Sequence, residues 1–485
     1  MNYVILYPDE MRAESLACYG HPTVKTPNID ALAAEGTLFE QNYSAHPVCV
    51  ASRCSLVTGW YPHVKGYRSQ YNLMKDTETT FIAELNQAGY TTALAGKDDC
   101  FDKESNQRIF GEYMPFRGGS RPVMDGKKHY DMIMPASPDG QLEKNIDVVC
   151  AEDSSDFIRR HSKDDKPFVL WVNFLAPHPP YTAPETFFNM YKESDVPPQR
   201  TEDWLEGKPS TYKYCKYYRE ADQEPEGTFV RMNAVYLGMI SFVDALVGRI
   251  VKTLKEQGIY EDTTIILCSD HGDFAGDANL CEKTPNGLDD MLTRVPLIVR
   301  RPGCPGGHRV KELTQSIDIF PTIFDYESLE MGHDQFGVSL KPQIDGAAGD
   351  PDRVVYAEGG YDTREMQCFE LLGPEGSARR KFMGPGSIYY PKFMHQEHQP
   401  ESVCRAVMRR DSKYKIVLRT NGEHELYDME ADPLEYRNLY GNPAYEALFQ
   451  ELSNKTLLWL LHTSDVVPHV SGEAPAWFAE KKDEK

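Results

Sequence analysis

The feature that most constrains the fold of this chain is a set of short, nearly all-apolar runs that each stop at polar residues. Two of them read FVLWVNF, from Phe168 to Phe174, and TTIILC, from Thr263 to Cys268. A strand that is apolar on both sides is typical of a parallel sheet covered by helices on both faces. Asn2 to Tyr7 and Thr91 to Ala95 are shorter runs of the same kind. The four runs predict a sheet buried inside the protein.

Amphipathic segments with helix-ending glycines lie between these predicted strands. Helices are expected at IDALAAEG after Pro27, at Thr79 to Ala88 and at Phe229 to Gln257. Strands that alternate with helices favour a parallel arrangement of the strands. We therefore predict an α/β fold with a large mixed, mostly parallel sheet sandwiched by helices.

The pattern changes near residue 350, beyond which short strands and turns replace the longer elements. The expected strands and the final helix are Val354 to Glu358, Ala406 to Arg409, Tyr414 to Leu418, Glu425 to Tyr427 and Tyr445 to Leu461. We predict a larger domain over 1–350 and a smaller C-terminal α+β domain with an antiparallel sheet over 351–485. Segments 103–145, 182–227 and 361–402 lack periodicity and are predicted to be surface loops.

The charge balance and the cysteines limit the partners and the compartment. The chain has 52 Lys and Arg against 74 Asp and Glu, a net charge of -22, which argues against binding to nucleic acid. The most apolar run is too short to cross a bilayer, and no signal peptide is recognised at the N-terminus. Eleven cysteines without a CxxC pair predict reduced thiols. We expect a cytoplasmic protein without membrane association; a trimmed periplasmic or secreted form is the alternative.

Polar residues follow four of the predicted strands at the points where they end: Asp9, Lys97, His178 and Asp270. In α/β sheets the chemistry lies at the carboxyl ends of the strands. Glu10 and His271 are the next residues after two of these ends. Neighbouring carboxylates repel one another unless a cation lies between them, and an oxygen-rich set favours a hard ion such as Ca²⁺ or Mg²⁺. The sequence therefore predicts a metal site, although a lone Asp at a strand end is more often a turn residue.

Basic side chains placed near the same ends would bind a tetrahedral anion: Arg53, Lys97, His178 and Lys283. Any one of them is more often a surface charge or the partner of a carboxylate. Their common placement at the ends of strands or in neighbouring segments favours a basic site within an acidic protein.

Ordered motifs along the sequence connect the chain to a known family. Cys49 to Arg53 reads CVASR, which matches a Cys-x-Pro/Ala-x-Arg pattern, and SLVTGWYP follows it closely. The other matching stretches are PDEMRAESLACYG with TPNIDALAAEGTLF, Gly96-Lys97, Pro177-His178-x-Pro180, SDHGDFAGD with Lys283, and the late ELYD and DPLEYRNL. In these motifs the chain resembles the sulfatase family of the alkaline phosphatase superfamily, over nearly its whole length.

The resemblance implies an alkaline phosphatase-like fold and a metal-dependent mechanism. Cys49 would be oxidised to formylglycine, and its metal-bound hydrate would attack the sulfur of a sulfate ester, releasing an alcohol and then inorganic sulfate. The expected ion is Ca²⁺, with Mg²⁺ and Mn²⁺ as alternatives. The implied metal ligands are Asp9, Glu10, Cys49, Asp270 and His271. Among these, Glu10 stands where relatives usually have Asp or Gln.

The same resemblance implies catalytic roles for the basic residues. Arg53 would orient the formylglycine, while Lys97 and Lys283 would hold the sulfate. His178 would protonate the leaving alcohol. Many relatives carry a histidine two residues after the lysine, whereas this chain has Asp99. Asp99 is therefore a candidate base for the second step, with a structural or substrate-binding role as the alternative.

The resemblance also indicates partners. Ala51 replaces a commoner proline, a variant that goes with radical maturation in relatives, so a radical formylglycine-generating maturase is the expected partner. The expected substrate is a small-molecule or oligosaccharide sulfate ester, preferably a sulfated carbohydrate. The three unpatterned segments would form the rim of the pocket, and His63, Arg68 and Gln70 are either rim or surface residues. The sequence predicts no oligomeric state.

Three other functions remain open at this point. Hydrolysis of phosphonate monoesters or phosphodiesters uses the same motifs in relatives. A binding protein that has lost turnover would keep the fold, but the intact Cys49 and Arg53 argue against it. A cysteine hydrolase with unmodified Cys49 and His178 as its base leaves the metal carboxylates without a role.

Overall fold

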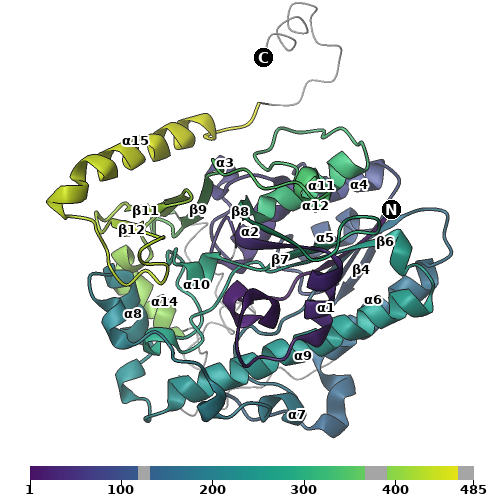
Figure 1. Ribbon diagram of the computed structural model, residues 1–485, viewed down its shortest axis with the longest axis horizontal. Coiled ribbons are helices and arrows are strands. Elements are labelled where there is room, and N and C mark those ends of the chain that lie inside the picture. The colour runs from purple at the N-terminus through teal and green to yellow at the C-terminus, as the bar shows by residue number, and fades with distance from the viewer. Residues whose placement is uncertain (71, 118–131, 366–389, 468–485) are drawn as a thin grey trace, which may run out of the picture.

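An eight-stranded sheet forms the centre of the protein in the computed structural model, which describes residues 1–70, 72–117, 132–365 and 390–467 (Figure 1). The strand order is β4-β3-β5-β1-β6-β7-β2-β8. The strands are β1 (Asn2–Leu6), β2 (Thr37–Tyr43), β3 (Thr91–Gly96), β4 (Glu112–Pro115), β5 (Phe168–Asn173), β6 (Thr263–Cys268), β7 (Leu297–Arg300) and β8 (His308–Gln315).

The direction of the strands agrees with the predicted mixed, mostly parallel sheet. β1 is parallel to both of its neighbours, with Val4 opposite Leu170 of β5 and Ile265 of β6. Among the described strands of this sheet, β7 alone runs against the others. The four apolar runs of the sequence are the adjacent strands β3, β5, β1 and β6, so their carboxyl ends lie side by side.

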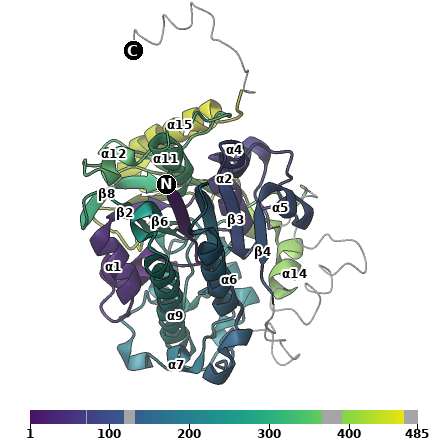
Figure 2. The ribbon, with the colours of Figure 1, turned by 90° about the vertical axis from the view of Figure 1, so that its right-hand side faces the viewer.

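Helices cover both faces of the sheet (Figure 2). Val4 and Leu6 of β1 face a core formed with α1, α6 and α9, whereas Tyr3, Ile5 and Tyr7 face a second core formed with α2, α4 and α11. The helices are α1 (Pro27–Glu35), α2 (Cys49–Thr58), α3 (Pro62–Lys65), α4 (Phe81–Gln87), α5 (Lys103–Ile109), α6 (Ile146–His161), α7 (Glu185–Phe188), α8 (Ser210–Tyr218), α9 (Thr228–Glu256), α10 (Asp290–Thr293), α11 (Ile319–Tyr326), α12 (Lys341–Ile344), α14 (Tyr390–His398) and α15 (Glu446–His462).

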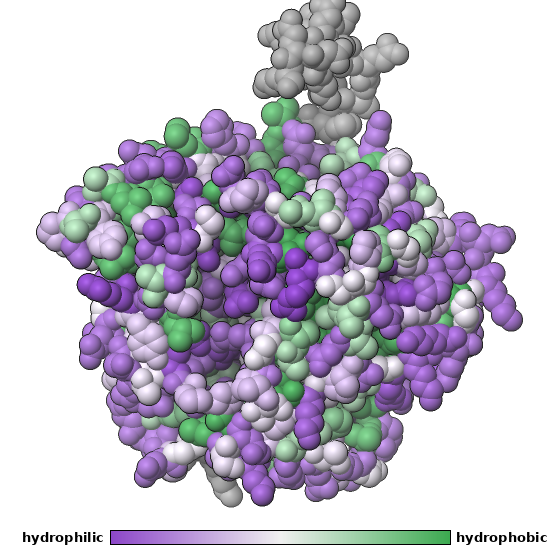
Figure 3. Space-filling model, in the orientation of Figure 1, coloured by the Kyte–Doolittle hydropathy of each residue, from purple (hydrophilic) through white to green (hydrophobic). Residues whose placement is uncertain are grey.

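One described helix, α9, is long and apolar enough to cross a membrane by length and composition alone. Inside the fold, 78% of its most apolar window is buried against the sheet and its neighbours. It is therefore a core helix, and the face of the molecule in Figure 3 is mostly hydrophilic, with small hydrophobic patches.

A second, four-stranded antiparallel sheet follows in the C-terminal part, on one side of the main sheet (Figure 1). Its order is β12-β11-β10-β9, and α15 packs on it. Its strands are β9 (Val355–Gly359), β10 (Ala406–Arg410), β11 (Tyr414–Arg419) and β12 (Glu425–Asp428). The predicted antiparallel sheet and final helix are thus confirmed. The domain boundary near residue 350 remains our proposal. The two parts are in contact across it, because the N–H group of Glu358 donates to the carbonyl oxygen of Ala45 at 2.9 Å.

The prediction that three segments are surface loops was wrong for their described parts. The first segment contains α5 and the edge strand β4, and residues 390–398 of the third form α14. In the second segment, Trp204 and Tyr212 are fully buried in a small core of their own. These elements are short or lie at an edge, so they do not show the longer periodicity on which the prediction depended. Residues 118–131 and 366–389 lie outside the described residues.

Candidate active site

Cys49 and Arg53 occupy the first two turns of α2, which begins at the carboxyl edge of the main sheet. Cys49 is the first residue of the helix, and its Sγ lies 3.2 Å from Nε2 of His271 and 3.6 Å from Oδ1 of Asp9. One turn later, Arg53 places Nη2 2.9 Å from Oδ2 of Asp270 and Nη1 2.8 Å from Oδ1 of Asn173. The spacing of four residues puts both side chains on one face of the helix, because an α-helix has 3.6 residues per turn.

Asp270 and His271 follow β6 in a turn that is fixed by backbone hydrogen bonds. Oδ1 of Asp270 accepts from the N–H groups of Glu10 at 3.1 Å and of His271 at 2.9 Å. Nδ1 of His271 lies 2.9 Å from the carbonyl oxygen of Gly272, so this nitrogen carries the proton. Burial lowers the pKa of His271, although Asp270 opposes the effect. Its Nε2 lone pair therefore faces Cys49 and can bind a metal.

Asp9 and Glu10 come directly after β1 and have opposite electrostatic surroundings. Burial favours a raised pKa for Asp9, but Lys97, His178 and Arg53 hold that pKa well below its usual range. For Glu10, burial raises the pKa well above its usual range; Lys283 opposes this rise, and Asp273 adds to it.

The backbone also presents Glu10 to the site in a constrained way. Its φ is 66°, in the left-handed region that residues other than glycine rarely adopt. The hydroxyl of Tyr236 donates to its carbonyl oxygen at 2.6 Å, and its N–H donates to Asp270. These two contacts hold the chain in the turn that follows β1.

Lys97 and Asp99 follow β3 and lie on the Arg53 side of Asp9. Lys97 pairs with Asp9 and, at 3.1 Å, with Oδ2 of Asp99. Oδ1 of Asp99 lies 3.2 Å from Nε of Arg53. Burial opposes the charge of Lys97, but Asp9 and Asp99 raise its pKa well above the usual value. Asp99 is thus placed between two cations.

His178 and Lys283 both contact Glu10. Nε2 of His178 is 3.2 Å from Oε1 of Glu10 and 3.5 Å from Nζ of Lys283, and Lys283 pairs with the same carboxylate. Burial, together with Lys283, lowers the pKa of His178 well below its usual value. Asp147 of α6 fixes the turn before His178, since it accepts from Leu175 N at 2.6 Å.

The donor atoms in this site fit a divalent cation. Asp9, Cys49, Asp270 and His271 each offer one donor atom within 4.8 Å of the others. Two ligand atoms that each lie about 2.4 Å from an ion, with a right angle between the two bonds, are about 3.4 Å apart. This separation agrees with the spacing of the four donor atoms. Glu10 belongs to an overlapping group with Asp9, Cys49 and His178. Its Oε2 is buried and has no hydrogen-bond donor among the described residues, and the carboxyl group of Asp273 lies beside the same side chain.

Other predicted candidates have structural contacts, and one functional contact was missed. His63 lies within hydrogen-bond distance of Glu358 and of Thr463 in the C-terminal part, and Arg68 pairs with Glu365. Asn173, which holds Arg53, was not predicted. Its signal was the single polar residue within the otherwise apolar run FVLWVNF.

Gly272 offers a test of how tightly the His271 turn is packed. A Cβ atom at this position would lie 1.9 Å from the carbonyl oxygen of Met291, which is too close for any side chain. We expect Gly272→Ala to lower the free energy of unfolding by about 1–3 kcal/mol through overpacking, as measured by urea unfolding. Gly140→Ala is the control, since its Cβ meets nothing within 4 Å. Equal stability of the two variants would contradict the prediction.

Comparisons with known proteins agree with this arrangement. An arylsulfatase of Clostridium perfringens is 26% identical over 505 aligned residues, which cover 92% of this chain and 91% of that protein. The structure of the phosphonate monoester hydrolase SpPMH from Silicibacter pomeroyi has a TM-score of 0.77 at 23% identity and covers 95% of both chains. A protein solved with its substrate D-glucosamine-2-N,6-O-disulfate has a TM-score of 0.72 at 20% identity, covering 95% of this chain and 98% of that one.

The family profile described as Sulfatase matches residues 1–327, which contain every residue that the sequence placed in the site. The two solved structures share the fold of the chain, and the arylsulfatase is similar along almost all of it. The chain therefore belongs to the sulfatase family of hydrolases, within the alkaline phosphatase superfamily.

Proposed function

We propose that this protein hydrolyses sulfate esters with Cys49 matured to formylglycine. The observation that carries the proposal is the position of Cys49 at the start of α2, with its Sγ among the donor atoms of Asp9, Asp270 and His271. Burial raises the pKa of the thiol well above its usual value, and Asp9 adds to the rise. Since a thiol is a much weaker nucleophile than a thiolate, Cys49 suits a precursor better than the nucleophile of a cysteine hydrolase.

The ester would lie between two groups of cations. Lys97 pairs with Asp9 and Lys283 pairs with Glu10, and the first N–H groups of α2 add donors for an anion. Asp9, Glu10, Asp270 and His271, together with the group formed from Cys49, would hold a divalent metal, which we expect to be Ca²⁺. When bound, such a metal lowers the pKa of an attacking hydroxyl and neutralises charge on the sulfate.

The reaction needs three proton transfers besides the attack on sulfur. One hydroxyl of the formylglycine hydrate would lose its proton and form a bond to sulfur while the bond from sulfur to the alcohol oxygen breaks, and the leaving alcohol oxygen would take up a proton. The other hydroxyl then loses its proton, the aldehyde forms again and sulfate leaves.

The sequence led us to expect that His178 protonates the leaving alcohol, but a neutral imidazole with its proton on Nδ1 has none to give from Nε2, so we propose instead that His178 accepts the proton of the second hydroxyl. Burial keeps its imidazole neutral, its Nδ1 faces Pro179 O, and its Nε2 lies in the same group of donor atoms as Cys49. Lys283, 3.5 Å from that Nε2, would stabilise the charge on the leaving oxygen. Asp99 is paired with Arg53 and Lys97, which favours a positioning role over the role of a base.

The substrate that we propose is a sulfated carbohydrate. The similarity to a protein solved with a glucosamine disulfate supports this class. Cys49 would be matured by a radical formylglycine-generating enzyme, as Ala51 favours, in the cytoplasm.

A second candidate is a phosphonate monoester hydrolase, because SpPMH shares the fold at a TM-score of 0.77. The test is a side-by-side measurement of kcat/KM for an aryl sulfate, an aryl phosphonate monoester and glucosamine sulfates, with matured protein and Ca²⁺. We expect the highest kcat/KM for a sulfated sugar. A preference of 100-fold or more (about 2.7 kcal/mol) for the phosphonate would reverse the assignment.

A further inference from the structure

Glu282 lies next to Lys283 and has an unusual backbone conformation. Its φ is 60°, in the left-handed region, and two hydrogen bonds fix it there. Its N–H donates to the hydroxyl of Tyr181 at 2.9 Å, and its carbonyl oxygen accepts from Phe274 N at 2.8 Å. In an extended chain neighbouring side chains point to opposite sides. Here Oε1 of Glu282 lies only 3.4 Å from Nζ of Lys283.

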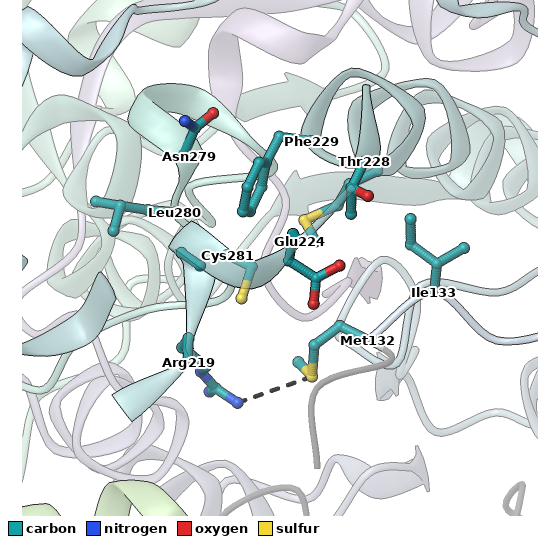
Figure 4. A pocket seen from close by; sticks show the side chains of 11 residues that line it. Met132, Ile133, Arg219, Glu224, Thr228, Phe229, Asn279, Leu280 and Cys281 are labelled. Carbon is teal, nitrogen blue, oxygen red and sulfur yellow. Dashed lines mark hydrogen bonds between the residues drawn. The ribbon is translucent and has the colours of Figure 1, made fainter. Parts of the chain in front are cut away.

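The other oxygen of Glu282 pairs with Arg219, which ends α8. Both side chains are almost completely buried, with exposures of 4% for Arg219 and 1% for Glu282. Arg219 also donates from Nη1 to Sδ of Met132 at 3.8 Å, across a small cavity that Cys281 lines as well (Figure 4). The cavity volume of about 30 Å³ is enough for about two water molecules. The carboxylate of Glu282 is thus a close, buried charge partner of this arginine, and Glu224 lines the same cavity.

Four buried charges of alternating sign thus form a row: Arg219, Glu282, Lys283 and Glu10. Lys283 touches two carboxylates in this row, Glu10 closely and Glu282 at 3.4 Å. A cation bound at Asp9 would repel Lys283 and compete with it for Glu10, because like charges at this distance in a buried site interact strongly.

We infer that Glu282 is a positioning residue that draws Lys283 away from Glu10, so that Glu10 is available to the metal and Lys283 to the sulfate. Arg219 limits this effect, because it pairs with the same carboxylate of Glu282. This inference rests on the proposed metal site and on the proposed role of Lys283 in the sulfatase reaction.

Substitutions of Glu282 and of Arg219 are expected to change the affinity for the metal in opposite directions. In Glu282→Gln, Lys283 has Glu10 as its close carboxylate partner, so a metal has to displace a buried ion pair. In Arg219→Met, Glu282 keeps its charge and attracts Lys283 more strongly, so Glu10 becomes easier to bind. Turnover falls in both variants. In Glu282→Gln, Lys283 is misplaced; in Arg219→Met, the charge of Lys283 is compensated by Glu282.

The test measures the Kd for Ca²⁺ by calorimetric titration of chelator-treated, matured protein, together with kcat. We expect Glu282→Gln to weaken Ca²⁺ binding by about 10-fold or more. Arg219→Met is expected to bind Ca²⁺ as tightly as the unaltered protein or more tightly, with kcat lowered by about 10-fold. The control is Glu425→Gln, which breaks the equally buried pair with Arg419 in the C-terminal sheet and is expected to leave the Kd unchanged.

Two results would overturn the inference while leaving the proposed function intact. One is an unchanged Kd in folded Glu282→Gln; the other is the same weakening in Arg219→Met as in Glu282→Gln, which would indicate a purely structural pair. If a single variant does not fold, the double variant Arg219→Met/Glu282→Gln removes both charges of the pair. It is expected to bind Ca²⁺ as weakly as Glu282→Gln. A Kd equal to that of the unaltered protein would overturn the inference. Absence of Ca²⁺ and Mn²⁺ binding in the unaltered protein would instead contradict the metal site itself.

Discussion

Replacement of Cys49 by alanine is expected to lower kcat/KM for sulfate esters by about 10,000-fold or more, since removal of a nucleophile leaves only binding and electrostatic effects. The side chain is buried at the start of α2 and lies on Asp9 and His271, so no neighbouring group can replace it. Hydrolysis of an aryl sulfate by parent and variant, each matured in the same way, measures the loss.

The matched control is Cys54→Ala, one turn further along α2. Sγ of Cys54 faces Cys100 at 4.0 Å in the core, so this variant is expected to keep its activity. Mass spectrometry of the peptide that contains Cys49 is expected to show a decrease of about 18 Da, the change from thiol to aldehyde. Full activity of Cys49→Ala, or of protein with an unmodified thiol, would disprove the formylglycine mechanism.

Removal of the divalent metal by a chelator is expected to lower kcat by about 1,000-fold or more, because a metal supplies several kcal/mol of charge stabilisation in the transition state. Addition of Ca²⁺ is expected to restore activity. Binding also stabilises the folded state, by about 2.7 kcal/mol at a concentration of 100 times Kd. A rise in the Tm with added Ca²⁺ is therefore a second measurement, independent of turnover.

His271→Ala is the variant that connects this effect to the site, because Nε2 of His271 faces Cys49 and Asp9. It is expected to lose the Ca²⁺-dependent rise in the Tm. His333→Ala serves as the control. His333 is a buried histidine elsewhere in the fold, and its two ring nitrogens lie within hydrogen-bond distance of Glu84 and of the carbonyl oxygen of Thr58. Unchanged turnover in protein shown to be free of divalent metal would contradict the prediction.

Much of the fold follows from local patterns. The runs that became β1, β3, β5 and β6 are apolar on both sides, and a strand of that kind is stable only between two layers of helices. The polar residues after these runs lie at one edge because the four strands are parallel neighbours. Short elements were missed, among them β4 and α8, because partners distant in the sequence stabilise them.

The sequence alone was enough to predict the type of sheet, the polar residues that meet at its carboxyl edge and the family, because short motifs and strand periodicity are local properties of the chain. The pairing of Lys283 with both Glu10 and Glu282, and of Glu282 with Arg219, arises only in the tertiary structure. Lys283 and Glu10 are separated by 273 positions, and Arg219 and Glu282 by 63. Which buried charges meet depends on the packing of α8 and of the turns after β1 and β6, and this packing decides how each charge is compensated.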